Sequence, residues 1–166
     1  MEEQIKPIRT LALAGLILHT VWTAINIVTR LFPQPFLTLL RSPFSEEVAK
    51  LTGNPLLLLM PLISLGVYIL LFCLLHGQLQ SPTNAAGTLF GMTLGAVPAL
   101  SVISFLMSFV TRTVIMAYHD AATLGAYSVL NSGLSYVQII DSLAFPLLIA
   151  AAAMNWQRVR SAAPQQ

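Results

Sequence analysis

The chain has 166 residues, of which 56% are hydrophobic and only 8% are charged, and its formal net charge is +2. A soluble domain carries roughly 25% charged residues, and a small protein has a large surface for its volume, so this composition excludes an ordinary soluble domain. The eight basic residues are dispersed along the chain. Nucleic-acid binding needs clustered cations, so we expect no nucleic-acid partner and a surface that faces membrane lipid.

The first predicted membrane span covers about residues 10–31, with Lys6 and Arg9 before it and Arg30 near its end. A helix that crosses the bilayer core needs about 20 predominantly apolar residues, and this stretch has that length. It is longer than the roughly 7–15-residue apolar core of a signal peptide. We therefore expect a transmembrane helix that is retained in the protein.

The link between the first two spans, about residues 32–54, is the longest connection. Ser45 is suited to cap a short helix whose first turn would hold Glu46 and Glu47. Gly53 would end that helix. The pattern predicts a short interfacial helix on the membrane surface, and the alternative is a loop whose apolar side chains dip into the interface.

Three further stretches are long and apolar enough to span a bilayer: residues 55–76, 86–110 and 133–155. Asn54 and Pro55 form a helix-start signal before the second span, and Asn131–Gly133 predicts a break and a cap before the fourth. A proline inside each of these three spans predicts local kinks: Pro61, Pro98 and Pro146. We expect residues 1–166 to form one domain, an all-α integral membrane bundle of four transmembrane helices.

Four spans place both termini on the same side of the membrane. The basic residues near span ends divide equally between the two sides: Lys6, Arg9, Arg158 and Arg160 against Arg30, Arg41, Lys50 and Arg112. We count Arg112 with the bundle and not with the loop. On the positive-inside rule we then expect both termini to be cytoplasmic.

The third span carries a small-residue motif for helix packing. Gly87, Gly91 and Gly95 repeat every four residues and so predict a smooth face for close helix approach. That face either packs inside the monomer or forms the seam of a homo-oligomer or of a larger membrane complex.

Polar residues inside the spans define one candidate site. His19 and Asp141 stand near the middle of the first and fourth spans, at similar depths of about 14 Å and about 17–20 Å from one side by helix rise. Polar residues share one helix face on each of the first three spans. These faces consist of His19, Thr23, Asn26 and Arg30 on the first span, Ser64 and Tyr68 on the second, and Ser101, Ser104, Ser108 and Arg112 on the third. The candidate intramembrane polar site therefore consists of His19, Asn26, Arg112, Gln138 and Asp141.

Two interpretations of this site remain open. In the functional one, an Asp141–His19 pair with its polar neighbours binds a polar solute or relays protons. In the structural one, Asp141 is protonated or hydrogen-bonded and the polar side chains hold the helices together. We do not expect a haem with two histidine ligands, because His19 differs in depth from His76 and His119 by about 13 Å or more.

The sequence holds no nucleotide-binding glycine loop, serine nucleophile elbow or metal-ligand cluster, and Cys73 is its only cysteine. We expect no enzyme activity, no metal and no cofactor. The first functional hypothesis is a non-enzymatic helix-association protein or accessory subunit. The alternatives are a small-solute or proton-coupled transporter or channel that uses the polar site, and a lipid-acting membrane enzyme near Arg112, His119 and Asp120.

Overall fold

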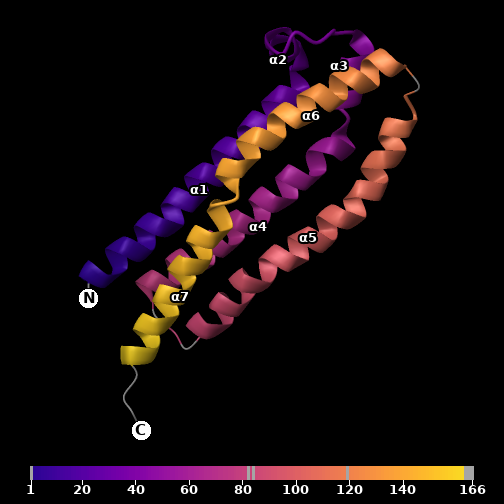
Figure 1. Ribbon diagram of the computed structural model, residues 1–166. Coiled ribbons are helices and arrows are strands. Elements are labelled where there is room, and N and C mark those ends of the chain that lie inside the picture. The colour runs from indigo at the N-terminus through magenta and orange to yellow at the C-terminus, as the bar shows by residue number, and fades with distance from the viewer. Residues whose placement is uncertain (1, 82, 84, 119, 163–166) are drawn as a thin grey trace.

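The computed structural model describes residues 2–81, 83, 85–118 and 120–162. These residues form seven helices and no strand, in the order α1 (Glu2–Leu31), α2 (Pro33–Leu39), α3 (Glu46–Thr52), α4 (Pro55–Gln80), α5 (Ala86–Met116), α6 (Ala121–Asp141) and α7 (Ala144–Ala162) (Figure 1). The predicted all-α class is confirmed.

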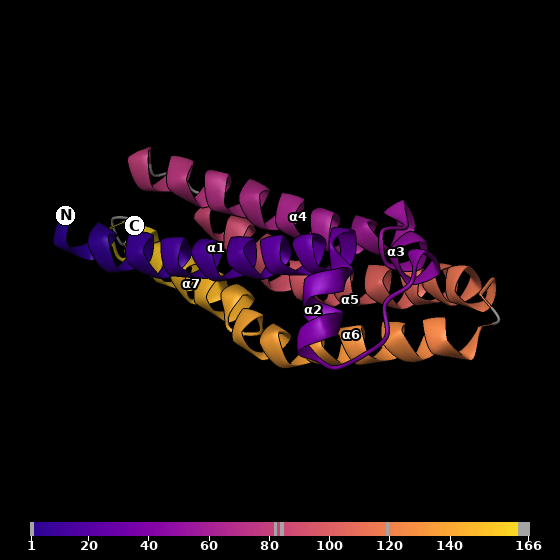
Figure 2. The same cartoon turned by 90° about the horizontal axis from the view of Figure 1, so that it is seen from above.

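The long helices lie side by side along one direction (Figures 1 and 2). The two termini and the α4–α5 connection share one end of the bundle, and α2, α3 and the α5–α6 connection share the other (Figure 1). Four helical segments are long and apolar enough to cross a membrane: Glu3–Leu31, Glu46–Gln80, Ala86–Met116 and Ala121–Ala162. The fold is therefore that of a multi-pass membrane bundle with both termini at the same end.

The most extensive contact between two helices is that of α1 with α7, and small residues lie in it. Ala12 of α1 and Ala151 of α7 are both buried in the main core with Leu75 of α4. The outer faces remain apolar, as Leu70 of α4 and Phe109 of α5 show, with 60% and 58% of their surfaces exposed. Lipid offers no hydrophobic drive between helices, so close packing of small side chains is the expected way to hold such a bundle together.

The connection between α1 and α4 forms a cap over one end of the bundle (Figure 1). The predicted helix is present as α3, because the Ser45 hydroxyl accepts a hydrogen bond from the Val48 N–H at 3.2 Å and Gly53 is the C-cap. The sequence did not predict α2, whose Leu37 packs with Val48 against Leu130 of α6. The cap is thus packed onto α6, which gives its apolar side chains a protein contact.

The fourth span differs from its prediction. The structure has no break at Asn131–Gly133, and instead α6 runs unbroken to Asp141 and the chain leaves the helix at Ser142 and Leu143. The break moves because Pro146 has no N–H for the carbonyl of residue 142 and its ring crowds that carbonyl. The Leu143 N–H bonds instead to the Ile140 carbonyl, three residues back, at 3.3 Å.

The helices extend beyond the other predicted spans. Helix α1 begins at Glu2 and not near residue 10, α4 continues to Gln80, and α5 continues to Met116. The helical hydrogen-bond pattern continues past the apolar stretch in each case, because it does not depend on the polarity of the side chains.

Candidate functional site

A cavity of about 580 Å³ lies between α1, α4, α5 and α6. We call it the polar cavity, because hydroxyl, amide and charged side chains from all four helices line it. Every member of the predicted polar site lines it: His19, Asn26, Arg112, Gln138 and Asp141. The cavity exists because α5 packs against α4 and α7 rather than against α6.

The polar face of α1 turns inward, as its spacing predicts. His19, Thr23, Asn26 and Arg30 expose 2%, 1%, 7% and 9% of their surfaces, and all four line the polar cavity. Most of the other side chains in the predicted span of α1 are apolar, so burying this face keeps its polar groups out of lipid.

His19 connects two other helices through its two ring nitrogens. Its Nδ1 lies 2.7 Å from Oδ1 of Asp141, and its Nε2 lies 3.0 Å from the Ser64 hydroxyl. With the ring proton on Nδ1, His19 donates to the carboxylate and accepts from the serine hydroxyl. The pairing predicted for His19 and Asp141 is present, and Ser64 completes a relay from hydroxyl to imidazole to carboxylate.

The aromatic ring of Tyr68 supports this relay and the helix break beside it. The ring stacks on the His19 imidazole with centroids 5.1 Å apart, and its hydroxyl donates to the Ala144 carbonyl at 3.0 Å. That carbonyl belongs to the first residue of α7. Tyr68 therefore holds the start of α7 against His19 of α1.

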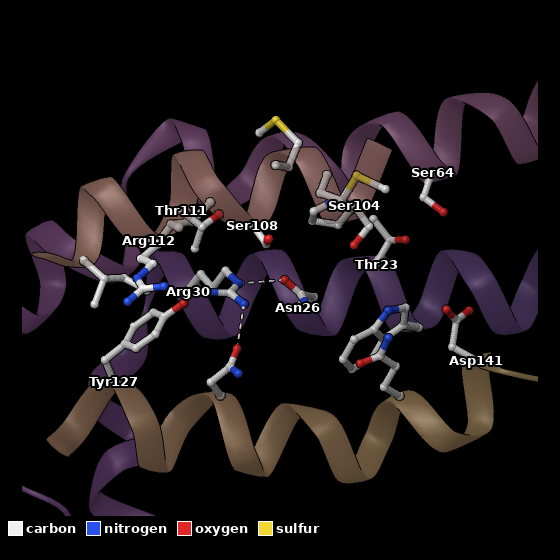
Figure 3. A pocket seen from close by; sticks show the side chains of 18 of the residues that line it. Thr23, Asn26, Arg30, Ser64, Ser104, Ser108, Thr111, Arg112, Tyr127 and Asp141 are labelled. Atoms are coloured by element: carbon white, nitrogen blue, oxygen red, sulfur yellow. Dashed lines mark hydrogen bonds between the residues drawn. The ribbon is translucent and has the colours of Figure 1, made fainter. Parts of the chain in front are cut away.

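The opposite end of the polar cavity is cationic. Figure 3 shows Arg30, Arg112 and Tyr127 at this end, and Ser64 and Asp141 at the other. Arg30 donates from Nε to Oδ1 of Asn26 at 2.9 Å and from Nη2 to Oδ1 of Asn131 at 3.2 Å (Figure 3).

Among the described residues, Arg30 and Arg112 have no acidic counterion. The buried Nη1 of Arg30 has no hydrogen-bond partner among the described residues. Within the same part of the chain, the sole ion pair is that of His19 with Asp141, so no carboxylate neutralises Arg30 or Arg112. This end of the cavity is therefore suited to an anion.

A second cavity, of about 1120 Å³, adjoins the first. We call it the apolar cavity, because Leu94, Val97, Phe105 and Ile149 line it. The residues common to both cavities are Met60, Ser64, Ser104, Ser108, Gln138 and Asp141. The hydroxyl of Ser64 and the carboxylate of Asp141 therefore stand at the junction between a cationic compartment and an apolar one.

Several functional candidates were not chosen from the sequence. Asn131 was taken as part of a helix break, and Trp22 and Tyr127 were not assigned to the site, although all three line the polar cavity. Ser64 was noted only for its spacing. Its bond to His19 depends on how α1 and α4 meet, which no local pattern reports.

The predicted glycine face is divided by the fold. A side chain at Gly87 would meet the Trp156 ring at 3.1 Å, whereas a methyl group at Gly91 or Gly95 would meet nothing within 4 Å. The first glycine therefore packs inside the chain, and the other two leave an open surface on α5.

The predicted lipid site near Arg112, His119 and Asp120 stays a prediction, because one of its three residues lies outside the described part of the chain. Arg112 lines the polar cavity, and His119 lies outside the described residues. Asp120 caps α6 by accepting a 2.7 Å hydrogen bond from the Thr123 N–H, and this bond lowers the pKa of the Asp120 carboxyl. No group of three or more metal-ligating side chains occurs within the described residues.

Comparisons with protein-family models, with curated proteins and with solved structures find no match to this chain.

Proposed function

We propose that this protein binds an amphiphilic anion inside the membrane, with the anionic group at Arg30 and Arg112 and the hydrocarbon part in the apolar cavity. The observation that carries the proposal is the Arg30 guanidinium. It is 9% exposed, it faces a cavity, and its Nη1 is unpaired among the described residues.

A buried cation without a counterion is costly. The penalty for taking one ion out of water is several kcal/mol after relaxation. Two asparagine oxygens, those of Asn26 and Asn131, satisfy part of the Arg30 donor set but supply no negative charge. An anion between Arg30 and Arg112 would supply that charge and accept from the remaining donors, and guanidinium is well suited to phosphate and carboxylate.

The adjoining apolar cavity supports an amphiphile rather than a small inorganic anion. The level of His19 lies 11 residues from the level of Arg30 along α1, or about 16 Å by helix rise. An anion alone would occupy only the cationic end. A molecule with a head at the arginines and a tail past Ser64 would fill both cavities.

The break between α6 and α7 favours a transporter over a protein that only binds the anion. Interrupted helices near the middle of the bilayer recur in transporters, where they border the substrate site. Here the break between α6 and α7 borders both cavities through Asp141, and Ser142 lines the apolar one. We therefore extend the proposal to exchange of the bound anion with the bilayer between α5 and α6.

Tryptophan fluorescence offers a direct binding test. The chain has two tryptophans, and Trp22 lines the polar cavity. In a Trp156→Phe protein, held in phosphatidylcholine nanodiscs, Trp22 would be the sole reporter. We expect dodecyl phosphate to change its emission saturably, and dodecanol and inorganic phosphate each to bind at least about tenfold more weakly, since losing one good interaction of about 1.4 kcal/mol gives that factor.

Arginine variants make the test specific. Arg112→Gln removes one of the two charges from an exposed position, and we expect it to weaken dodecyl phosphate binding by about tenfold or more. Arg9→Gln makes the same chemical change on the exposed surface near the other end of the bundle and should leave binding unchanged. Equal weakening by both variants, or binding of dodecanol as tight as dodecyl phosphate, would refute the proposal.

Helix association remains a second candidate, because Gly91 and Gly95 present an open small-residue surface on α5. If this surface is a self-association seam, Gly91→Leu should convert an oligomer in nanodiscs to monomer by single-molecule photobleaching. A parent protein that is already monomeric would remove this candidate and leave the binding proposal intact.

A further inference from the structure

Ser64 differs from the other serines of the membrane helices in what its hydroxyl contacts. The hydroxyls of Ser101, Ser108, Ser135 and Ser142 donate to carbonyls of their own helices, within four residues. The Ser64 hydroxyl instead bonds to Nε2 of His19 on another helix at 3.0 Å. A hydroxyl that donates to an imidazole has a proton acceptor in place.

The imidazole is in turn oriented by a carboxylate. Asp141 accepts from Nδ1 of His19 at 2.7 Å, which fixes the proton on Nδ1 and leaves Nε2 free to take the serine proton. The rings of Tyr68 and Phe145 pack against the imidazole with centroids 5.1 and 5.5 Å away and hold its plane. Serine, histidine and aspartate in this order form the arrangement by which unrelated folds activate a serine nucleophile.

The position of Ser64 also suits a nucleophile. It is partly exposed and lines both cavities, so an acyl chain in the apolar cavity would bring its carbonyl carbon to the hydroxyl. Helix α7 begins next to this junction, at Ala144. The partial positive charge at the start of a helix would stabilise negative charge developing on a carbonyl oxygen there.

We propose that Ser64, His19 and Asp141 form a membrane-embedded acyl-hydrolase site for an acyl ester whose chain occupies the apolar cavity. The Ser64 oxygen attacks the carbonyl carbon while its proton passes to Nε2 of His19. The bond to the alcohol then breaks, and the alcohol leaves with that proton. Ser64 is left as an acyl ester.

Water completes the reaction. It attacks the acyl-Ser64 carbonyl carbon and gives one proton to Nε2 of His19. The bond to the serine oxygen breaks, the proton returns to Ser64, and a carboxylic acid is released. The polar cavity, lined by side chains such as Ser104, Ser108 and Thr111, provides the route by which water reaches Ser64.

In this mechanism Ser64 and His19 are the catalytic residues and Asp141 is a positioning residue. The inference rests on the proposed function only in that the substrate is an amphiphile within the same two cavities. It predicts an activity that binding of an anion does not require.

An alkyl fluorophosphonate with a biotin tag tests the site, because its phosphorus is attacked as an acyl carbonyl would be. The full-length protein in phosphatidylcholine nanodiscs should form one covalent adduct, found on Ser64 by peptide mass spectrometry. Ser64→Ala should abolish it. Ser135→Ala, at an exposed serine outside both cavities, should be labelled at the parent rate.

The relay predicts graded effects on the labelling rate. His19→Gln should slow labelling by about 10²–10⁴-fold, the usual range for losing a general base. Asp141→Asn should slow it strongly, and Asp141→Glu should recover part of the rate, which loss of structure would not do. Circular dichroism identifies any variant that fails to fold, and the mapped adduct on the parent protein needs no variant at all.

The two proposals fail separately. The fluorophosphonate probe carries no anionic group, so its adduct on Ser64 tests the hydrolase site without requiring the anion site at Arg30 and Arg112. Absence of an adduct on the folded parent protein, an adduct on another residue, or full labelling of Ser64→Ala would each overturn the hydrolase site. Those outcomes would not affect the binding of dodecyl phosphate that Trp22 fluorescence reports.

Discussion

Gly15 is the position at which a single methyl group tests the packing that builds the site. It lies on α1 opposite the break between α6 and α7. A methyl group there would meet the Tyr68 hydroxyl and would lie 2.8 Å from the Ala144 carbonyl oxygen. Those are the two partners of the hydrogen bond that holds the start of α7. Gly15→Ala must therefore displace α7, Tyr68 or both.

Two effects determine how much Gly15→Ala should lower the free energy of unfolding. Overpacking a tight contact costs about 1–3 kcal/mol. Loss of a buried hydrogen bond costs about 1 kcal/mol in addition. Gly66→Ala is the matched control, because it also replaces a helical glycine by alanine but its methyl group meets nothing within 4 Å. Both variants gain helix propensity, so the free energy of unfolding of Gly15→Ala should lie about 2–4 kcal/mol below that of Gly66→Ala.

Reversible unfolding in mixed dodecyl maltoside and dodecyl sulfate micelles, followed by circular dichroism, would measure this difference. A double-mutant cycle tests whether the loss of stability comes from the contact of the new methyl group with Tyr68. Tyr68→Phe removes the hydroxyl that the new methyl group would meet, so Gly15→Ala should cost at least about 1 kcal/mol less in that background. Equal stability of Gly15→Ala and Gly66→Ala, or strict additivity with Tyr68→Phe, would show that α1 and α7 do not meet as described.

Three further changes test other parts of the structure. Asp120→Asn should remove the stability that the ionised Asp120 carboxylate gives to α6. In the parent protein this stability is present above the unfolded-state pKa of Asp120 and is lost as the pH falls through its lowered folded-state pKa. The thermal midpoint of the variant should therefore change less between pH 6 and 3 than that of the parent, and an unchanged pH dependence would contradict the cap. Ser45→Ala should destabilise α3 by about 0.5–2 kcal/mol, seen as faster hydrogen exchange at α3 amides with α7 amides unaffected. Pro146→Ala should restore a backbone donor at the break and change the distance between spin labels placed on α6 and α7, while Pro98→Ala in α5 should leave that distance unchanged.

The bundle was predictable because its signals are local or compositional. Apolar stretches of about 20 residues identify spans whatever their neighbours are. The cap of α3 was predictable for a similar reason, since Ser45 contacts the Val48 N–H only three residues away. The depth of His19 and Asp141 could also be estimated, because helix rise is nearly constant.

What the sequence did not disclose depends on contacts between distant segments. Asp120 was not recognised as the cap of α6, and Asn131–Gly133 resembled a helix boundary but proved to be helix interior. The role of Ser64 follows from a contact 45 positions away in the chain. The two cavities arise from the divergence of α5 and α6, which no periodicity in either helix encodes.

The choice between a structural and a functional polar site depends on charge rather than on the number of polar groups. Interhelical polar contacts in membranes contribute only about 0.6 kcal/mol on average, so they hold helices together best when each group is paired. His19 meets that requirement, with a partner on each ring nitrogen. Unpaired polar atoms on Thr29 and Asn155 lie outside both cavities, so an orphaned atom alone does not define a site.

Arg30 is different because it brings a full positive charge into the bundle beside Arg112 and lines a cavity with it. A leucine at residue 30 would close that space without any desolvation cost, and replacing buried ions by apolar residues is often neutral or stabilising. An arginine that only held helices together would therefore be a poor solution at this position. An arginine that receives an anion accounts for the charge, for the open space beside it and for the unpaired donor.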